Sequence, residues 1–216
     1  MLGELFDADD ELLIEDRLRP HWGQSGAIVF ITMRTNDSIP KEVITTWELE
    51  KCDWMRRNGI VNFNHSTDAI KQLTEADLAK FRKKFNRQRE TTLDQCLGKC
   101  VLRSPEMAKI VAESLMYFDG QRYRMGDFVV MPNHIHFLVC FGDPESMKKQ
   151  CASWMHYTAV QINRLLGQKG KFWQQEPFDH LVRSLKQYEY LREYIRRNPE
   201  KARLSPGEFY YRRHES

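Results

Sequence analysis

Three segments of the chain are almost continuously apolar and rich in β-branched or aromatic residues, which is typical of buried strands. They are residues 27–34 (AIVFITMR), 123–131 (YRMGDFVVM) and 134–141 (HIHFLVCF). Only Pro132-Asn133 separates the last two segments, so we expect them to pair as an antiparallel hairpin. Residues 171–185 lack such a run and are expected to be mostly loop or short strand.

Elsewhere the apolar residues recur at helical spacing. We therefore predict helices over residues 41–57, 75–95, 105–118, 146–166 and 186–197, with an irregular stretch at 58–73. Start and stop signals support these bounds. Thr74-Glu75-Ala76-Asp77 resembles a capping box, and Ser104-Pro105 is a typical helix start. The last helix is expected to end at Asn198-Pro199, because proline disfavours the helical conformation of the residue before it.

This order of elements, a strand, helices, a hairpin and further helices, predicts an α+β domain with an antiparallel sheet. The charged helical stretch at about 41–100 has the character of an insertion after the first strand. We assign residues 17–204 to a single domain that includes this insertion. Residues 1–16 form an acidic N-terminal segment, and residues 205–216 a short basic tail.

Composition adds limits on location and redox state. The 216 residues are 41% hydrophobic and 12% aromatic, enough for a real core. No apolar run approaches a membrane span and the N-terminus is unlike a signal peptide, so we expect a cytoplasmic protein with no membrane partner. Of the five cysteines, only Cys96 and Cys100 have a suggestive spacing. With no second Cys or His pair nearby, the spacing favours two small residues on one helical face over a zinc site.

The net charge of +3 is too small to indicate nucleic-acid binding by itself. Its distribution is more informative, because the first sixteen residues are acidic and basic clusters such as Arg82-Lys83-Lys84 and Arg196-Arg197 follow. Such clusters can supply phosphate contacts, although each alone is also typical of an ordinary solvated helix face.

His134-Ile135-His136 is the first candidate for chemistry. Side chains alternate along a strand, so the two imidazoles point the same way, about 7 Å apart along the backbone, while Ile135 and Phe137 point to the other face. Two imidazoles on a rigid strand form half of a divalent-metal site. A pair of surface or core histidines would give the same pattern.

Tyr194 and Asn198 are four residues apart and therefore lie on one face of the last helix. An amide oxygen can be a third ligand for a hard divalent cation. A phenol, with a reference pKa near ~10, attacks a phosphate well only when a metal ion polarises that phosphate. The competing interpretations are a tyrosine half-packed against the sheet and an asparagine that ends the helix by bonding to local backbone.

Several motifs in this order resemble the HUH single-tyrosine transposases. The segment 129–139 (VVMPNHIHFLV) is similar to the metal-binding strand of that family. Six further motifs resemble the branch of this family that is associated with repeated extragenic palindromes (REP). They are 172–174 (FWQ), 178–183 (FDHLVR), 194–199 (YIRRNP), 19–22 (RPHW), 157–159 (YTA) and 163–167 (NRLLG). The resemblance covers most of residues 19–204.

The resemblance implies a ferredoxin-like antiparallel sheet flanked by helices. It also implies cleavage and rejoining of single-stranded DNA near hairpins, through a 5′-phosphotyrosine and a free 3′-OH. Carried over, the nucleophile is Tyr194 and the ligands of Mg²⁺ or Mn²⁺ are His134, His136 and Asn198, where insertion-sequence relatives usually have glutamine. The partner would be single-stranded or hairpin DNA, bound by a monomer or homodimer at the bacterial nucleoid.

Three alternatives stay open. The Tyr190-x-x-x-Tyr194 spacing also resembles two-tyrosine HUH enzymes, whose tyrosines alternate during strand transfer. A domesticated, catalytically silent protein would bind DNA hairpins without cleaving them. An unrelated metallohydrolase built on His134 and His136 would need further carboxylate or histidine ligands.

Four more residues are candidates for DNA contact. Trp173 is expected either to stack on an unpaired base or to pack in the core. His180 is expected to orient a ligand or contact a phosphate. Arg183 and Arg197 are candidate phosphate contacts.

Overall fold

The computed structural model describes residues 2–7, 13–15, 21–175 and 177–215. The chain divides into two compact units, one formed by residues 1–36 and 99–216 and the other by residues 37–98. The range of 41–100 expected for a helical insertion overlaps the second unit. Arg19 and Pro20 of the RPHW motif lie outside the described residues.

The first unit is built on a five-stranded, fully antiparallel sheet with the order β6-β3-β5-β4-β7. The strands are β3 (Ile28–Arg34), β4 (Tyr123–Met131), β5 (His134–Phe141), β6 (Phe178–Leu181) and β7 (Tyr210–Arg212). Without β7, the order in space is fourth, first, third and second along the chain, which is the ferredoxin-like arrangement. The predicted fold class is therefore confirmed. A separate two-stranded sheet pairs β1 (Leu13–Glu15) with β2 (His21–Gly23).

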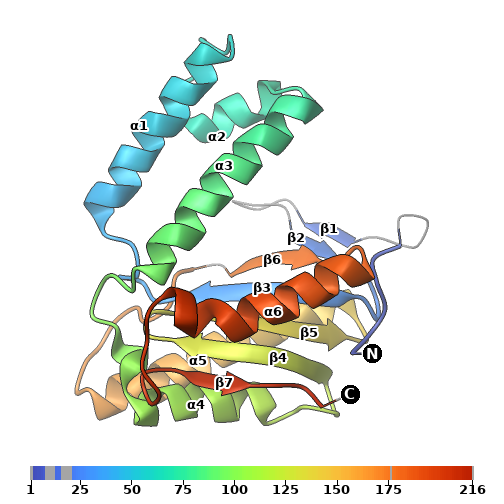
Figure 1. Ribbon diagram of the computed structural model, residues 1–216, viewed down its shortest axis with the longest axis vertical. Helices are drawn as coiled ribbons and strands as arrows, with labels where there is room; N and C mark the ends of the chain where they lie inside the picture. The colour runs from blue at the N-terminus through green and yellow to red at the C-terminus, as the bar shows by residue number, and fades with distance from the viewer. Residues whose placement is uncertain (1, 8–12, 16–20, 176, 216) are drawn as a thin grey trace. The chain divides into compact units, whose positions relative to one another are not determined.

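Helices cover both faces of the large sheet (Figure 1). The first face packs against α4 (Pro105–Met116) and α5 (Pro144–Leu165), and the second against α6 (Leu185–Lys201). Alternation along β5 divides its side chains between two apolar clusters. Ile135 and Phe137 belong to the cluster with α4 and α5, whereas Leu138 belongs to the cluster with α6. His134 and His136 have the parity of Leu138, so the sheet presents both toward α6.

A bulge interrupts the pairing of β4 with β5. Met125 pairs with Val139 but Phe128 pairs with Phe137, so β4 carries one extra residue. A Cβ at Gly126 would lie 2.7 Å from the Leu2 side chain and 3.0 Å from the Leu138 carbonyl oxygen, so glycine allows the close approach of β4 to β5 at the bulge. The extra residue reverses the alternation and turns Asp127 toward α6.

Helix α6 continues to Lys201, so the prediction that it ends at Asn198-Pro199 is wrong. Pro199 removes one backbone donor in the last turn. The carbonyl groups of Asn198 and Pro199 nevertheless accept hydrogen bonds from Ala202 and Leu204. Burial of Pro199 together with Ile195 stabilises the helical path against the local preference.

The second unit contains α1 (Lys41–Arg57), α2 (Ser66–Ala69), the 3-10 turn η1 (Ile70–Gln72) and α3 (Glu75–Asp94). Its own small core comprises Met55, Ala69, Phe81 and Phe85. The hydroxyl of Thr74 accepts a hydrogen bond from the Asp77 backbone at 3.2 Å, as the capping motif predicts. The short helix α2 and the 3-10 turn η1 lie within residues 58–73, so the prediction that this stretch is irregular is wrong for residues 66–72.

The interpretation of Cys96 and Cys100 as neighbours on a helical face is wrong. Helix α3 ends at Asp94, and both cysteines have a φ of 51°, in the left-handed region. Cys96 donates its N–H to the Leu93 carbonyl, which is typical of the residue that follows a helix C-terminus.

Both ends of the chain join the first unit. Leu2 is buried in the cluster beneath α6, and Glu4 bridges to Ala27. Residues 210–212, expected to belong to a basic tail, form the edge strand β7 beside β4. No helix of the described residues is both long and apolar enough to cross a bilayer.

Candidate active site

The two histidines of β5 lie side by side on the face that α6 covers. Their ring centroids are 4.6 Å apart, and both side chains are buried. His134 donates from Nδ1 to the Asn133 side-chain oxygen at 2.7 Å, so its Nε2 carries the lone pair. His136 Nδ1 lies 2.8 Å from the hydroxyl of Thr32, its partner across the β3–β5 ladder. Both rings are thus held through Nδ1, which is how metal-ligating histidines are usually oriented.

Burial decides the protonation state of His134. It lowers the pKa of this imidazole to about 3, and the nearby Asn198 side chain opposes the shift in part. No hydrogen bond of acceptable geometry joins the two side chains, and His134 Nε2 has no hydrogen-bond partner among the described residues. The imidazole is therefore neutral at pH 7 and its Nε2 can accept a cation.

Asn198 is fully buried on α6, and neither polar atom of its amide has a hydrogen-bond partner among the described residues. A buried amide left unpaired costs free energy. Because it makes no bond to local backbone and lies inside α6, the helix-ending role considered from the sequence does not apply. An imidazole nitrogen beside a carboxamide oxygen fits the donor set of a divalent cation.

Tyr194 lies one turn before Asn198, and its hydroxyl is 3.4 Å from His136 Nε2. Its side chain is only 8% exposed. Phe30 packs among the aromatic groups of the site, with its ring centroid 5.4 Å from that of His136 and 6.1 Å from that of Tyr194. The spacing in sequence had placed Tyr194 and Asn198 on one helix face, and the structure brings both to the histidine pair.

Tyr190 differs from Tyr194 in its surroundings. It is 64% exposed, and its ring lies 6.4 Å from that of Tyr194 at an interplanar angle of 25°. On the opposite side along the helix, Lys201 Nζ lies 4.3 Å from the centroid of the Tyr194 ring. Lys201 is seven residues after Tyr194 and therefore lies on the same face of α6. It was missed from the sequence because the helix was predicted to end before residue 201.

The other predicted DNA contacts separate into two groups. Trp173 is buried in the cluster on the α4–α5 face, and its indole N–H donates to Thr158 at 2.8 Å. Its side chain is only 3% exposed, so the structure favours the core role over stacking on a base. His180 pairs with Phe30 across β3 and β6, with ring centroids 5.2 Å apart, and so lies beside the site.

The two arginines lie at the surface. Arg183 is exposed at the end of β6, where its guanidinium lies 5.5 Å from the Phe6 ring centroid. Arg197 is exposed on the outer side of α6 and pairs with Glu200 at 3.3 Å and Glu193 at 3.9 Å.

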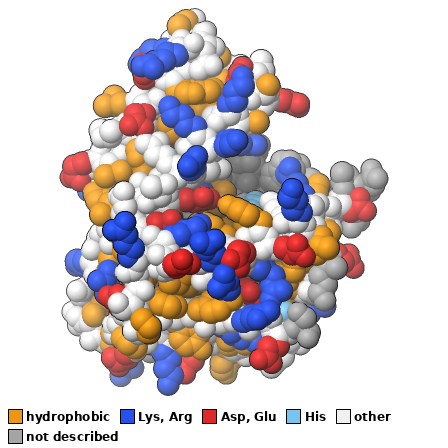
Figure 2. Space-filling view, in the orientation of Figure 1, with side chains coloured by type: hydrophobic (Ala, Val, Ile, Leu, Met, Phe, Trp, Pro, Cys, Tyr) orange, Lys and Arg blue, Asp and Glu red, His pale blue; other side chains and the backbone are white. Residues whose placement is uncertain are grey.

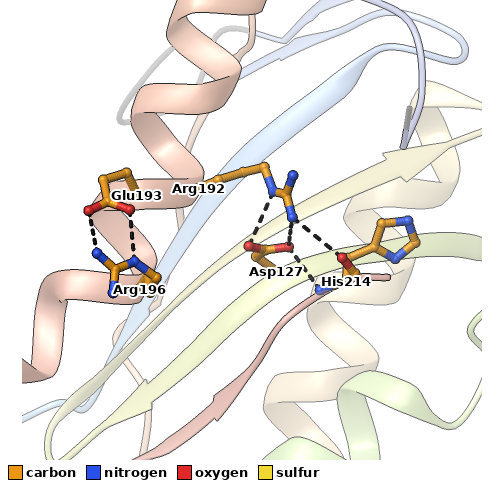
Figure 3. Close-up of polar contacts among 5 residues, drawn as sticks. All are labelled: Asp127, Arg192, Glu193, Arg196 and His214. Atoms are coloured by element: carbon orange, nitrogen blue, oxygen red, sulfur yellow. Dashed lines mark hydrogen bonds and ion pairs between the residues drawn. The ribbon is translucent and has the colours of Figure 1, made fainter. Parts of the chain in front are cut away.

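A partly buried ion pair that the sequence did not reveal fixes α6 to the sheet (Figure 3). Arg192 donates from Nε and Nη2 to the Asp127 carboxylate, both at 3.2 Å. The same carboxylate accepts the His214 backbone N–H at 2.9 Å. Arg192 is two residues before Tyr194, so the pair anchors the helix next to its tyrosine. The sequence did contain one signal for this ion pair, an acidic residue, Asp127, directly after Gly126 in an otherwise apolar strand.

No group of three or more His, Cys, Asp or Glu residues is placed to hold a metal within the described part of the chain. The further ligands that an unrelated metallohydrolase would require are therefore not found among these residues. The candidate set is two histidines completed by an amide.

No protein-family model matches this chain. No curated protein matches it either. Among solved structures, it is similar to one of a REP-associated tyrosine transposase bound to a REP hairpin. The identity is 15% and the TM-score 0.42, over 87% of this chain and 73% of the other. A likeness of this degree carries no argument about function, which has to come from the site itself.

Proposed function

We propose that this chain is a metal-dependent, single-stranded DNA strand transferase of the HUH single-tyrosine type, acting at DNA hairpins. One observation carries the proposal. The Tyr194 hydroxyl lies 3.4 Å from His136 Nε2, beside His134 Nε2 and the Asn198 amide, which are buried and have no hydrogen-bond partner in the part of the chain that the structure describes. A nucleophile and three candidate ligands thus come from two rigid elements that meet face to face.

His134, His136 and Asn198 would hold Mg²⁺ or Mn²⁺. When bound, such a cation polarises a scissile phosphate and stabilises the charge that develops on it. The contacts of Asn133 and Thr32 with the two Nδ1 atoms keep both Nε2 atoms directed at one site. Because His134 is neutral at pH 7, no proton has to leave it before it binds a cation.

Tyr194 supplies the nucleophile. Its hydroxyl oxygen bonds to phosphorus as the bond from phosphorus to the 3′-oxygen breaks, which leaves a 5′-phosphotyrosine and a free 3′-OH. The phenol loses one proton and the 3′-oxygen gains one, so the step is balanced. The phosphotyrosine conserves the bond energy for rejoining. Arg192, held by Asp127, positions the helix that carries Tyr194.

The recessed position of Tyr194 favours an unpaired substrate. A phosphate can approach an 8% exposed tyrosine only if its flanking nucleotides splay apart, which stacked duplex resists. His180 and Arg183, on and just after β6, are the proposed contacts on the sheet side. Arg197 is a proposed phosphate contact on the outer side of α6.

Denaturing gel electrophoresis of the protein with end-labelled hairpin DNA and Mn²⁺ tests the proposal. We expect a covalent adduct that Tyr194→Phe abolishes and the matched control Tyr190→Phe retains. The Phe side chain keeps the packing of Tyr194 and removes only the hydroxyl, so folding and hairpin binding should be unchanged. Adduct formation by Tyr194→Phe but not by Tyr190→Phe would assign the nucleophile to Tyr190.

The burial of the site also favours a second candidate, a hairpin-binding protein that no longer cleaves. His134, His136 and Tyr194 are all less than a tenth exposed. If that burial persists with DNA bound, no phosphate reaches the phenol. Hairpin affinity without any adduct, in both Mg²⁺ and Mn²⁺, would establish this alternative.

A further inference from the structure

Helix α3 of the second unit carries a stripe of four cations. Lys80, Lys83, Lys84 and Arg87 are spaced i, i+3, i+4 and i+7, so they follow one another along a single helix face. All four side chains are exposed. The apolar residues of the same helix turn the other way, with Phe81 and Phe85 buried in the core of the unit. Figure 2 shows Lys and Arg side chains spaced along the surface of this unit.

The stripe is largely unneutralised. Lys80 forms a surface ion pair with Asp77 at 3.0 Å. Lys83, Lys84 and Arg87 have no carboxylate partner among the described residues. Like charges three and four residues apart destabilise a helix, so this arrangement does not serve the stability of α3. It creates a local positive field on a unit whose other charges are mixed.

The chemistry of the stripe identifies its partner. From residue 80 to residue 87 the helix rises about 10 Å, a length over which each strand of a DNA duplex presents about three phosphates. Phe81 and Phe85 are buried, so the stripe offers no aromatic ring for base stacking, the usual device of single-strand binders. The apolar face is also occupied by the unit's own core, so it is not free to enter a membrane surface.

We propose that α3 binds the phosphate backbone of duplex DNA through Lys80, Lys83, Lys84 and Arg87, without reading sequence. This binding site goes beyond the proposed function and rests on it only in the choice of DNA over RNA. It gives the chain a duplex contact separate from the tyrosine site, which takes unpaired DNA.

Fluorescence anisotropy with a blunt, arbitrary-sequence duplex tests the site, using the full chain in EDTA so that no cleavage occurs. The variant is Lys83→Gln/Lys84→Gln/Arg87→Gln. The control, Lys109→Gln/Lys148→Gln/Lys149→Gln, removes the same net charge from exposed positions on α4 and α5. We expect the α3 variant to lose at least about tenfold in affinity near 0.1 M salt. The slope of log K against log salt should shrink by about 2 to 3, since each lost phosphate contact contributes about 0.9.

The control variant should bind the duplex like the unmodified chain. A charge-conserving variant, Lys83→Arg/Lys84→Arg/Arg87→Lys, should also retain affinity, and circular dichroism should show that all variants are folded. Equal losses in the α3 variant and its control would overturn the proposal. So would an equal loss of affinity for oligo(dT), or duplex RNA binding more than ten times tighter than duplex DNA.

This test is independent of the tyrosine chemistry. Tyr194→Phe should leave duplex affinity unchanged while abolishing the adduct. Failure of the unmodified chain to form an adduct would therefore count against the proposed function only. The anisotropy measurements with duplex DNA would still decide whether α3 binds duplex.

Discussion

His134 and Asn198 are neighbouring side chains, both fully buried and each with polar atoms that have no hydrogen-bond partner among the described residues. Sequence spacing identified both, because alternation on a strand and the i, i+4 rule on a helix hold locally. It did not identify Phe30, Thr32 or Lys201. Those residues reach the site through strand pairing or through the last turn of α6, which only the tertiary structure determines.

The depressed pKa of His134 predicts acid sensitivity in the metal-free protein. Its folded pKa of about 3 lies below the unfolded value near ~6.5, so the unfolded chain takes up the proton first as the pH falls. This contribution to stability is complete above about pH 6.5 and is lost progressively toward pH 3. At pH 5 the loss of this contribution should lower the unfolding free energy by about 2 kcal/mol.

Urea denaturation in EDTA, compared with His134→Gln, measures this effect. The variant lacks the titrating group, so its unfolding free energy should decline less between pH 7 and pH 5. Parallel declines of the two proteins would show that His134 is not the group responsible.

Asn198 allows a prediction that distinguishes a ligand from a packing residue. Asn198→Asp replaces the amide with a carboxylate of nearly equal volume, so the metal-free variant should melt at a lower temperature because it buries a charge. Saturating Mn²⁺ should raise its melting temperature more than that of the unmodified chain, since an anionic oxygen binds the cation more strongly.

Asn198→Ala should weaken Mn²⁺ binding in calorimetry, but less than His134→Ala does. Equal Mn²⁺ affinities in all these proteins would remove Asn198 from the ligand set.

At the scale of elements, continuous apolar runs and strong helix-end signals in the sequence were sufficient to predict several strands and helices. Strands β4 and β5 and helix α1 have the predicted bounds. The sequence failed where a local rule met tertiary packing, as at Pro199, which lies inside α6 despite its missing donor. It also missed β7 and the β4 bulge, because both depend on pairing between residues far apart in the chain.

The bulge supports a prediction about how α6 is held. Asp127 is 3% exposed and its partner Arg192 is 23% exposed, so removal of the guanidinium leaves a buried carboxylate unpaired. Arg192→Met should therefore reduce the unfolding free energy by about 3 kcal/mol. The double variant Asp127→Asn/Arg192→Met should recover part of that loss, because no uncompensated charge remains. A loss below about 0.5 kcal/mol in Arg192→Met, in urea denaturation, would contradict an anchoring role.

For the whole molecule, the ferredoxin-like sheet explains why the site lies where it does. The histidines lie on β5, the central strand of the sheet, and α6, which follows β6 along the chain, packs on the face toward which they point. The order of elements along the chain predicted an α+β domain with an antiparallel sheet, whereas the ferredoxin-like arrangement was implied only by the resemblance of its motifs to a known family. Trp173 shows the limit of that reasoning, because the sequence left open whether its ring stacks on an unpaired base or packs in the core, where the structure places it.

The two units give the final prediction. The ends of residues 37–98 meet closely, since a Cβ on Gly98 would lie 2.4 Å from the Asp37 carbonyl oxygen. A short Gly-Ser linker in place of residues 38–97 should therefore close the chain without straining the first unit, which has its own large core. The shortened protein should fold and form the Tyr194 adduct with single-stranded hairpin DNA, but its affinity for blunt duplex should fall as far as in the α3 variant. Circular dichroism and the adduct gel check the first part, and anisotropy checks the second. A folded, shortened protein that binds duplex as tightly as the full chain would place the duplex contact in the first unit.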